Sequence, residues 1–77
     1  MADGAPGGIV KRSVVVSRHR TSISLERAFW SALSDVARAE GASVNQLVSR
    51  IDRQRSGNLS SAVRVYLLAW FKARAAD

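Results

Sequence analysis

From Arg20 to Leu25 the side chains alternate between two kinds, and Arg20, Ser22 and Ser24 share a hydrogen-bonding chemistry. Successive side chains of a β-strand point to opposite faces, so a strand here would place Arg20, Ser22 and Ser24 on one face. The opposite face would carry Thr21, Ile23 and Leu25. One cation and two hydroxyls can donate and accept several hydrogen bonds on a flat surface. We therefore expect a strand at residues 18–25 with one face suited to recognition.

Catalytic and metal-binding residue sets are missing from the sequence. There is no cysteine, His19 is the single histidine, and the six acidic residues are scattered. The sequence lacks a nucleophile paired with a base, a metal-ligand set and a glycine-rich phosphate loop. We expect no enzyme activity, no metal and no cofactor, and no small-molecule effector is evident.

The charge balance favours a polyanionic partner. Twelve Lys and Arg residues against six Asp and Glu residues give a net charge of +6. Such an excess indicates either nucleic acid or an acidic membrane surface. The sequence contains no apolar run long enough to span a bilayer and no signal-peptide core. We therefore expect a cytoplasmic protein without membrane contact.

The N-terminal segment is expected to be a flexible basic arm over residues 1–17, followed by one domain over residues 18–77. Three valines at residues 14–16 interrupt the arm and could supply a second strand. However, the link at residues 17–19 has no glycine or asparagine to make a tight turn. A lone strand leaves its backbone N–H and C=O groups unpaired. We therefore expect the strand to pair antiparallel with its copy in a second chain.

Three helices are expected after the strand. The first begins near Glu26, has apolar residues at helical spacing, and stops at Gly41. Ser43 and Gln46 have the spacing of a capping box, which starts the second helix. Residues 56–58 break that helix, and a third is expected from about residue 60 to about residue 75. This third helix is apolar on most sides, so it needs cover that one small chain can hardly provide.

Several motifs in this order resemble the ribbon-helix-helix DNA-binding proteins, the superfamily of Arc and the methionine repressor. Residues 20–25 resemble the ribbon, and Gly41-Ala42-Ser43-Val44-Asn45 resembles the turn into the second helix. Residues 10–14 and 19–22, Phe29-Trp30 and residues 58–62 are similar to a bacterial subgroup of short ribbon-helix-helix proteins. The resemblance covers roughly residues 10–71. It does not explain the third helix or the length of the arm.

The resemblance implies a mostly α-helical, intertwined homodimer with one strand per chain, an intermolecular antiparallel ribbon and an added C-terminal helix. It implies that the ribbon reads DNA bases through Arg20, Ser22 and Ser24, and that the second helix clamps a phosphate through the amides of Ser43, Val44 and Asn45. Lys11, Arg12 and Arg18 are expected to make looser phosphate contacts. The expected dimer core consists of Ile23, Leu25, Phe29, Leu33, Val48 and Ile51.

The leading hypothesis is a sequence-specific double-stranded DNA-binding protein, most simply a transcriptional repressor in the bacterial nucleoid. Its partners would be DNA and further copies of itself, with higher assembly on DNA or through the third helix left open. An alternative is an antitoxin or adaptor whose main partner is another protein. Only a few residues follow the last expected helix, which we take to disfavour the antitoxin.

Overall fold

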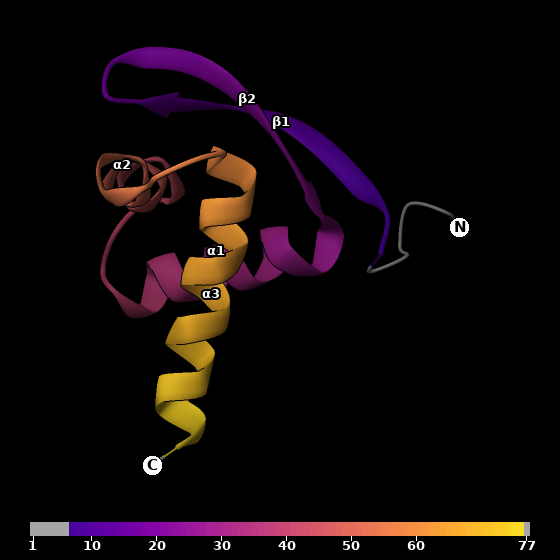
Figure 1. Cartoon of the computed structure of the whole chain (residues 1–77), viewed down its shortest axis with the longest axis vertical. Coiled ribbons are helices and arrows are strands. Elements are labelled where there is room, and N and C mark those ends of the chain that lie inside the picture. The colour runs from indigo at the N-terminus through magenta and orange to yellow at the C-terminus, as the bar shows by residue number, and fades with distance from the viewer. Residues whose placement is uncertain (1–6, 77) are drawn as a thin grey trace.

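The computed structural model describes residues 7–76 and has a two-stranded antiparallel ribbon followed by three helices (Figure 1). The ribbon arches over α2 and the first turns of α3, while α1 crosses behind α3. The elements, in chain order, are β1 (Ile9–Val16), β2 (His19–Glu26), α1 (Arg27–Ala39), α2 (Val44–Gln54) and α3 (Leu59–Ala75). The expected ribbon-helix-helix order with an added C-terminal helix is confirmed.

The source of the second strand differs from the prediction. Each chain has two strands, not one, because β1 occupies residues 9–16 of the expected flexible arm. β1 pairs antiparallel with β2 of the same chain, from Ile9 opposite Glu26 to Val16 opposite His19. The hydrogen bonds of the β2 edge that faces β1 are thus made within one chain. The prediction of one strand per chain was therefore wrong, and the pairing within the chain removes the reason given for an intermolecular ribbon.

The turn of this hairpin explains the error. Its two residues, Ser17 and Arg18, have φ angles of 51° and 72°. A two-residue turn with positive φ at both positions matches the twist of the flanking strands, and sequences usually supply asparagine and glycine there. Neither residue type is present. The left-handed conformation costs L-residues roughly 1–2 kcal/mol each, so other contacts must hold the turn closed.

Side chains from the helices supply those contacts along β1. The Val15 amide donates to Asn45 Oδ1 (3.2 Å), and the Ser17 amide donates to Ser49 Oγ (3.4 Å). The Ser49 hydroxyl donates in turn to the Val15 carbonyl (3.4 Å). At the other end of the strand, Trp30 Nε1 donates to the Val10 carbonyl (2.8 Å). β1 is therefore fixed to α1 and α2 as well as to β2.

The helix boundaries follow local signals closely. Gly41 ends α1 with a φ of 68°. The predicted capping box is present, with the Ser43 amide donating to Gln46 Oε1 (2.8 Å) and the Gln46 amide donating to Ser43 Oγ (3.0 Å). Asn58 caps α3 by accepting the Ser61 amide at 2.9 Å. Because each cap satisfies backbone groups that the helix leaves over, the sequence fixes where the helices start.

The core lies between the inner face of the ribbon and the three helices. Val14, Val16, Ile23 and Leu25 project from the ribbon onto the helices, as period-two alternation predicts for β2. Each helix contributes an apolar stripe; the buried helical residues are Trp30, Leu33, Val36, Ala37, Leu47, Val48, Ile51, Val63 and Leu67. The helices of residues 7–76 include none with the length and hydrophobicity to cross a bilayer.

Candidate nucleic-acid interface

The outer face of the ribbon, turned away from the helices, carries alternate residues of both strands. Three cross-strand pairs lie side by side on it: Lys11 with Ser24, Ser13 with Ser22, and Val15 with Arg20. The two flanking residues of β2 on the inner face, Ile23 and Leu25, are only 4% and 0% exposed. The ribbon is thus apolar on the inner face that packs against the helices and largely polar on the outer face.

The predicted base-reading residues all lie on this outer face. Arg20 and Ser22 are exposed and Ser24 is half-buried. The structure adds Lys11, Ser13 and Val15 from β1. Among these, the sequence predicts a role only for Lys11, as a loose phosphate contact from a flexible arm. The sequence does not alternate here, since residues 11–13 are polar and residues 14–16 are all valine, and the available signal is this β-branched run alone. The link at residues 17–19, which lacks a turn signal, argues against a strand at that stage.

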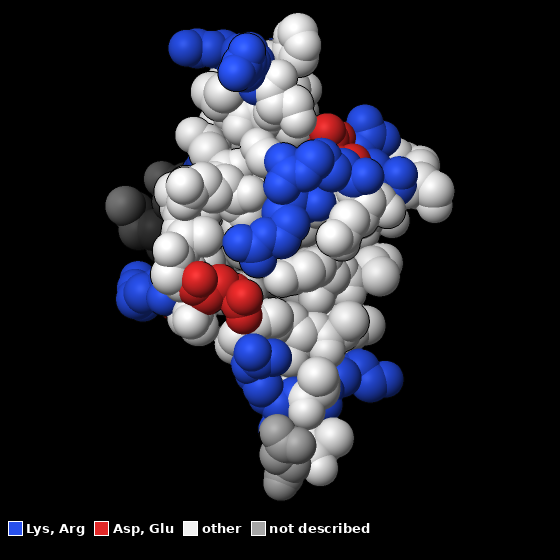
Figure 2. Space-filling model, turned by 90° about the vertical axis from the view of Figure 1, so that its left-hand side faces the viewer, with Lys and Arg blue, Asp and Glu red and all other residues white. Residues whose placement is uncertain are grey.

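A groove of about 500 Å³ runs between the hairpin turn and the start of α2. Arg18 lines it from the turn, and Arg50 and Arg53 line it from α2. Figure 2 shows the same face with cationic side chains gathered over α2 and further cations at the top, where the hairpin lies. Arg50 also contacts the Glu40 carboxylate at 3.7 Å, so its charge is partly offset.

The first turn of α2 opens beside this groove, which Ala42, Asn45 and Gln46 also line. The capping box consumes the amides of Ser43 and Gln46. Among residues 7–76 no hydrogen-bond acceptor is found for the amides of Val44 and Asn45, which lie in the first helical turn at its positive end. The predicted phosphate clamp therefore has available amides at two of its three residues, Val44 and Asn45. The Ser43 amide is already used.

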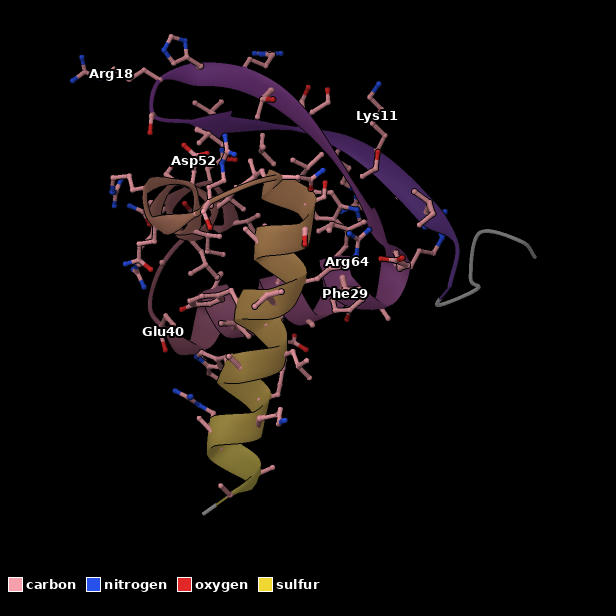
Figure 3. All side chains as sticks on the ribbon, in the orientation of Figure 1. Lys11, Arg18, Phe29, Glu40, Asp52 and Arg64 are labelled. Carbon is pink, nitrogen blue, oxygen red and sulfur yellow. The ribbon has the colours of Figure 1, made fainter. Side chains whose placement is uncertain are left out.

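The distribution of ion pairs also distinguishes this side of the molecule. The arginines with an ion pair within residues 7–76 include Arg38, Arg50, Arg55, Arg64 and Arg74. Cations with no ion-pair partner in that range include Lys11, Arg18 and Arg20 on the hairpin and Arg53 in the groove; Lys72 is the exception on α3. Figure 3 shows Lys11 and Arg18 towards opposite ends of the ribbon, pointing away from the helices. Uncompensated positive charge is concentrated around the ribbon.

The profile of the ribbon-helix-helix domain matches residues 9–71 of the chain, which includes both strands and most of α3. The chain belongs to the ribbon-helix-helix family. This is a family of DNA-binding regulators whose members generally form dimers. The matched range also includes β1, so the hairpin strand is part of the domain and not an appendage to it.

A solved structure of an uncharacterized protein from Bordetella pertussis Tohama I is similar to this chain. The TM-score is 0.78 at 29% sequence identity, and the match covers 91% of this chain. This chain spans 61% of the length of the Bordetella protein. No curated protein matches. The similarity supports the ribbon-helix-helix fold, including its third helix.

Arg12 lies elsewhere than the prediction implied. It is opposite Ile23 on the inner side of the ribbon, and its guanidinium lies 5.0 Å from the centroid of the Trp30 ring. An arginine over an aromatic face gains a cation–π interaction. Among the three cations expected to contact phosphates, Lys11 and Arg18 point outward, whereas Arg12 supports the packing of the ribbon against α1.

The end of β2 is tied to α3 by an ion pair. Arg64 Nε donates to Glu26 Oε1 at 2.9 Å, and a second guanidinium nitrogen donates to the Ser24 carbonyl at 3.4 Å. The hydrogen bond from Arg64 lowers the pKa of the Glu26 carboxyl below its usual value. A carboxylate therefore stands at this end of the ribbon, and the cationic turn stands at the other.

The expected dimer-core residues are used inside one chain. Ile23, Leu25, Leu33, Val48 and Ile51 are all no more than 4% exposed in the single chain, because β1 and α3 cover them. Phe29 differs, since it is only partly buried. It lines an apolar groove of about 320 Å³ between α1 and α3, together with Ala32, Val65, Leu68 and Phe71. Val65 and Leu68 are 63% and 60% exposed.

Proposed function

We propose that this ribbon-helix-helix protein binds double-stranded DNA sequence-specifically, with the outer face of the hairpin in the major groove. The observation that carries the proposal is the largely polar outer face of a two-stranded ribbon, surrounded by cations that have no ion-pair partner among residues 7–76. A two-stranded ribbon fits the width of the major groove. Acting in the bacterial cytoplasm, such a protein would most simply repress transcription by occupying its site.

Arg20 is the principal base-reading residue in this proposal. Its exposed guanidinium can donate two parallel hydrogen bonds to guanine O6 and N7, the commonest specific contact in the major groove. Ser22 and Ser24 follow at alternate positions on the same strand and can donate to or accept from any base. Arginine therefore sets most of the specificity, and the serines refine it.

Phosphate contacts surround the base-reading face. Arg18 and Arg53 flank the groove beside α2, where the Val44 and Asn45 amides add the positive end of a helix. Lys11 stands towards the other end of the ribbon. Each neutralised phosphate adds about 0.9 to the slope of the logarithm of affinity against the logarithm of salt concentration. These contacts orient the ribbon without reading sequence.

The test compares single alanine variants in DNA binding. Arg20→Ala should lose about tenfold to a hundredfold in affinity for a duplex selected from a random pool, with little change on random DNA. Arg53→Ala should weaken both duplexes equally and lower the salt slope by about one. Lys72→Ala removes a cation from α3 and is the matched control, expected to leave both unchanged. Equal binding by the wild type and Arg20→Ala would contradict the proposed base-reading role.

We also propose that two copies associate through the apolar groove between α1 and α3. Exposed apolar patches on small soluble proteins mark contact sites, and Val65, Leu68 and Phe71 form such a patch beside Phe29. A second copy is the favoured occupant, because the family forms dimers and the other expected dimer residues are already buried within the chain.

The same groove supports a second candidate function, an adaptor that binds another protein. Its lining is almost wholly apolar, with Arg64 at its margin, which suits an amphipathic helix of any origin. A chain that stays monomeric in isolation and binds no selected duplex would favour this adaptor over the DNA-binding regulator.

A further inference from the structure

Val15 is an exposed apolar side chain on the largely polar outer face of the ribbon, beside the base-reading residues. It is 42% exposed, whereas its neighbours Val14 and Val16 are 4% and 6% exposed on the core side. Strands favour β-branched residues, but the same outer face of β1 carries Lys11 and Ser13, so the strand does not require an apolar residue there. A valine turned towards solvent suggests an apolar contact in the bound state.

The register places Val15 directly opposite Arg20. Side chains of directly opposed residues have Cβ atoms about 4.5–5.5 Å apart, so the two side chains emerge next to each other. Whatever base pair Arg20 reaches, Val15 faces the same base pair or the next one. The two chemistries are complementary, since one donates hydrogen bonds and the other offers methyl groups.

The backbone of Val15 is also held in place by side chains of α2. Its amide donates to Asn45 Oδ1 at 3.2 Å, and its carbonyl accepts from Ser49 Oγ at 3.4 Å. Both partners lie on α2, whose first turn is the proposed phosphate clamp. A phosphate held at the start of α2 would therefore set how deeply Val15 enters the groove.

We propose that Val15 reads the 5-methyl group of a thymine adjacent to the guanine bound by Arg20. Thymine alone among the four bases presents a methyl group in the major groove, and apolar side chains contact it. The inference rests on the proposed DNA-binding function and extends it. Base reading then involves both strands of one chain, with β1 supplying an apolar contact beside the hydrogen bonds from β2.

Ile9 shows why the other end of the same face is not assigned this role. It is 59% exposed on the same strand and face, but it lies opposite Glu26. Glu26 is ion-paired with Arg64, and its carboxylate offers no hydrogen-bond donor to a base beside Ile9. Ile9 is therefore the matched control for Val15.

The experiment uses the full chain and a duplex that the wild type selects from a random double-stranded pool. Thymines of that duplex are replaced one at a time by deoxyuracil, which lacks only the methyl group. At one position next to the guanine, the wild type should lose about fourfold in affinity, the loss expected for one apolar carbon group. The Val15→Ser variant should bind the thymine and uracil duplexes with affinities within about 1.5-fold of each other. Serine suits this face, since Ser13 and Ser22 already lie on it.

The outcomes separate the inference from the function on which it rests. Ile9→Ser should keep the fourfold difference between thymine and uracil. Equal binding of both duplexes by the wild type, or an undiminished difference in Val15→Ser, would overturn the role of Val15 while leaving the Arg20 contact standing. If the wild type selects no duplex, or if Arg20→Ala binds as well as the wild type, the proposed function itself fails.

Discussion

At the scale of single residues, charge pairing divides this small basic protein into two parts. The arginines that pair with carboxylates do so within α1, at the end of α2, or between elements packed against each other. The cations left without such partners in residues 7–76 lie mainly around the ribbon. Glu26 belongs to the first group, because its pair with Arg64 joins the end of the ribbon to α3. The site residues Arg20, Ser22 and Ser24 could be placed from alternation alone, because each is adjacent to a buried or half-buried neighbour.

The Glu26 pair predicts a pH dependence of stability. Its carboxyl pKa is lowered in the folded chain, mainly by the hydrogen bond from Arg64. The stabilisation is therefore present above the unfolded-state pKa of about 4.3 and is lost as pH falls through the lower folded-state pKa. Glu26→Gln should reduce the free energy of unfolding at neutral pH, and the difference from the wild type should disappear as pH falls through the folded-state pKa. Urea unfolding across this range measures the effect.

A control for the Glu26 variant is available on the surface of α1. Asp35→Asn removes a carboxylate from the exposed pair with Arg38, whose nearest atoms are 3.5 Å apart. Exposed pairs contribute little, so this variant should follow the wild type at every pH. A Glu26→Gln variant with the wild-type pH profile would show that the pair with Arg64 has no net effect.

At the scale of elements, the helices could be predicted from the sequence and the hairpin could not. The stop at Gly41, the Ser43 capping box and the Asn58 break are local signals, and the helices begin and end where those signals occur. The Ser17-Arg18 turn has no such signal. Its conformation depends on contacts with Asn45 and Ser49, about 30 residues away along the chain. Local reasoning therefore assigned β1 to a flexible arm.

The hairpin turn itself predicts opposite effects of two substitutions at Arg18. Its φ of 72° suits glycine and strains a β-branched residue. Arg18→Gly should raise the free energy of unfolding by about 0.5 kcal/mol. Glycine relieves the strain of the positive φ, but it also gives the unfolded chain more conformational freedom, which offsets part of that gain. Arg18→Val should lower it by about 1 kcal/mol or more. Both variants lose the same charge, so a shared change would reflect electrostatics and contradict the conformational explanation.

At the scale of the whole molecule, the hairpin changes what a second chain is needed for. The sequence suggested that a partner must complete the ribbon, but β1 does so within the chain and also helps to bury five of the six expected dimer-core residues. Away from the ribbon, the described chain leaves an apolar face of α3 exposed at Val65, Leu68 and Phe71, beside Phe29 of α1. The excess of apolar residues in the third helix, evident in the sequence, thus points to a contact surface away from the ribbon.

This surface predicts that association and folding can be separated by neighbouring substitutions. Leu68 is 60% exposed, so Leu68→Glu should leave the far-ultraviolet circular dichroism and the unfolding midpoint nearly unchanged while converting a dimer to a monomer. Leu67 is 1% exposed, and Leu67→Ala should instead lower stability by about 2–5 kcal/mol. Light scattering at micromolar concentration measures the mass.

Ile9→Glu, which places the same charge on an exposed apolar residue of the ribbon, should keep the dimer. A wild-type chain that is monomeric at that concentration, or a Leu68→Glu variant that remains a dimer, would contradict association through α1 and α3.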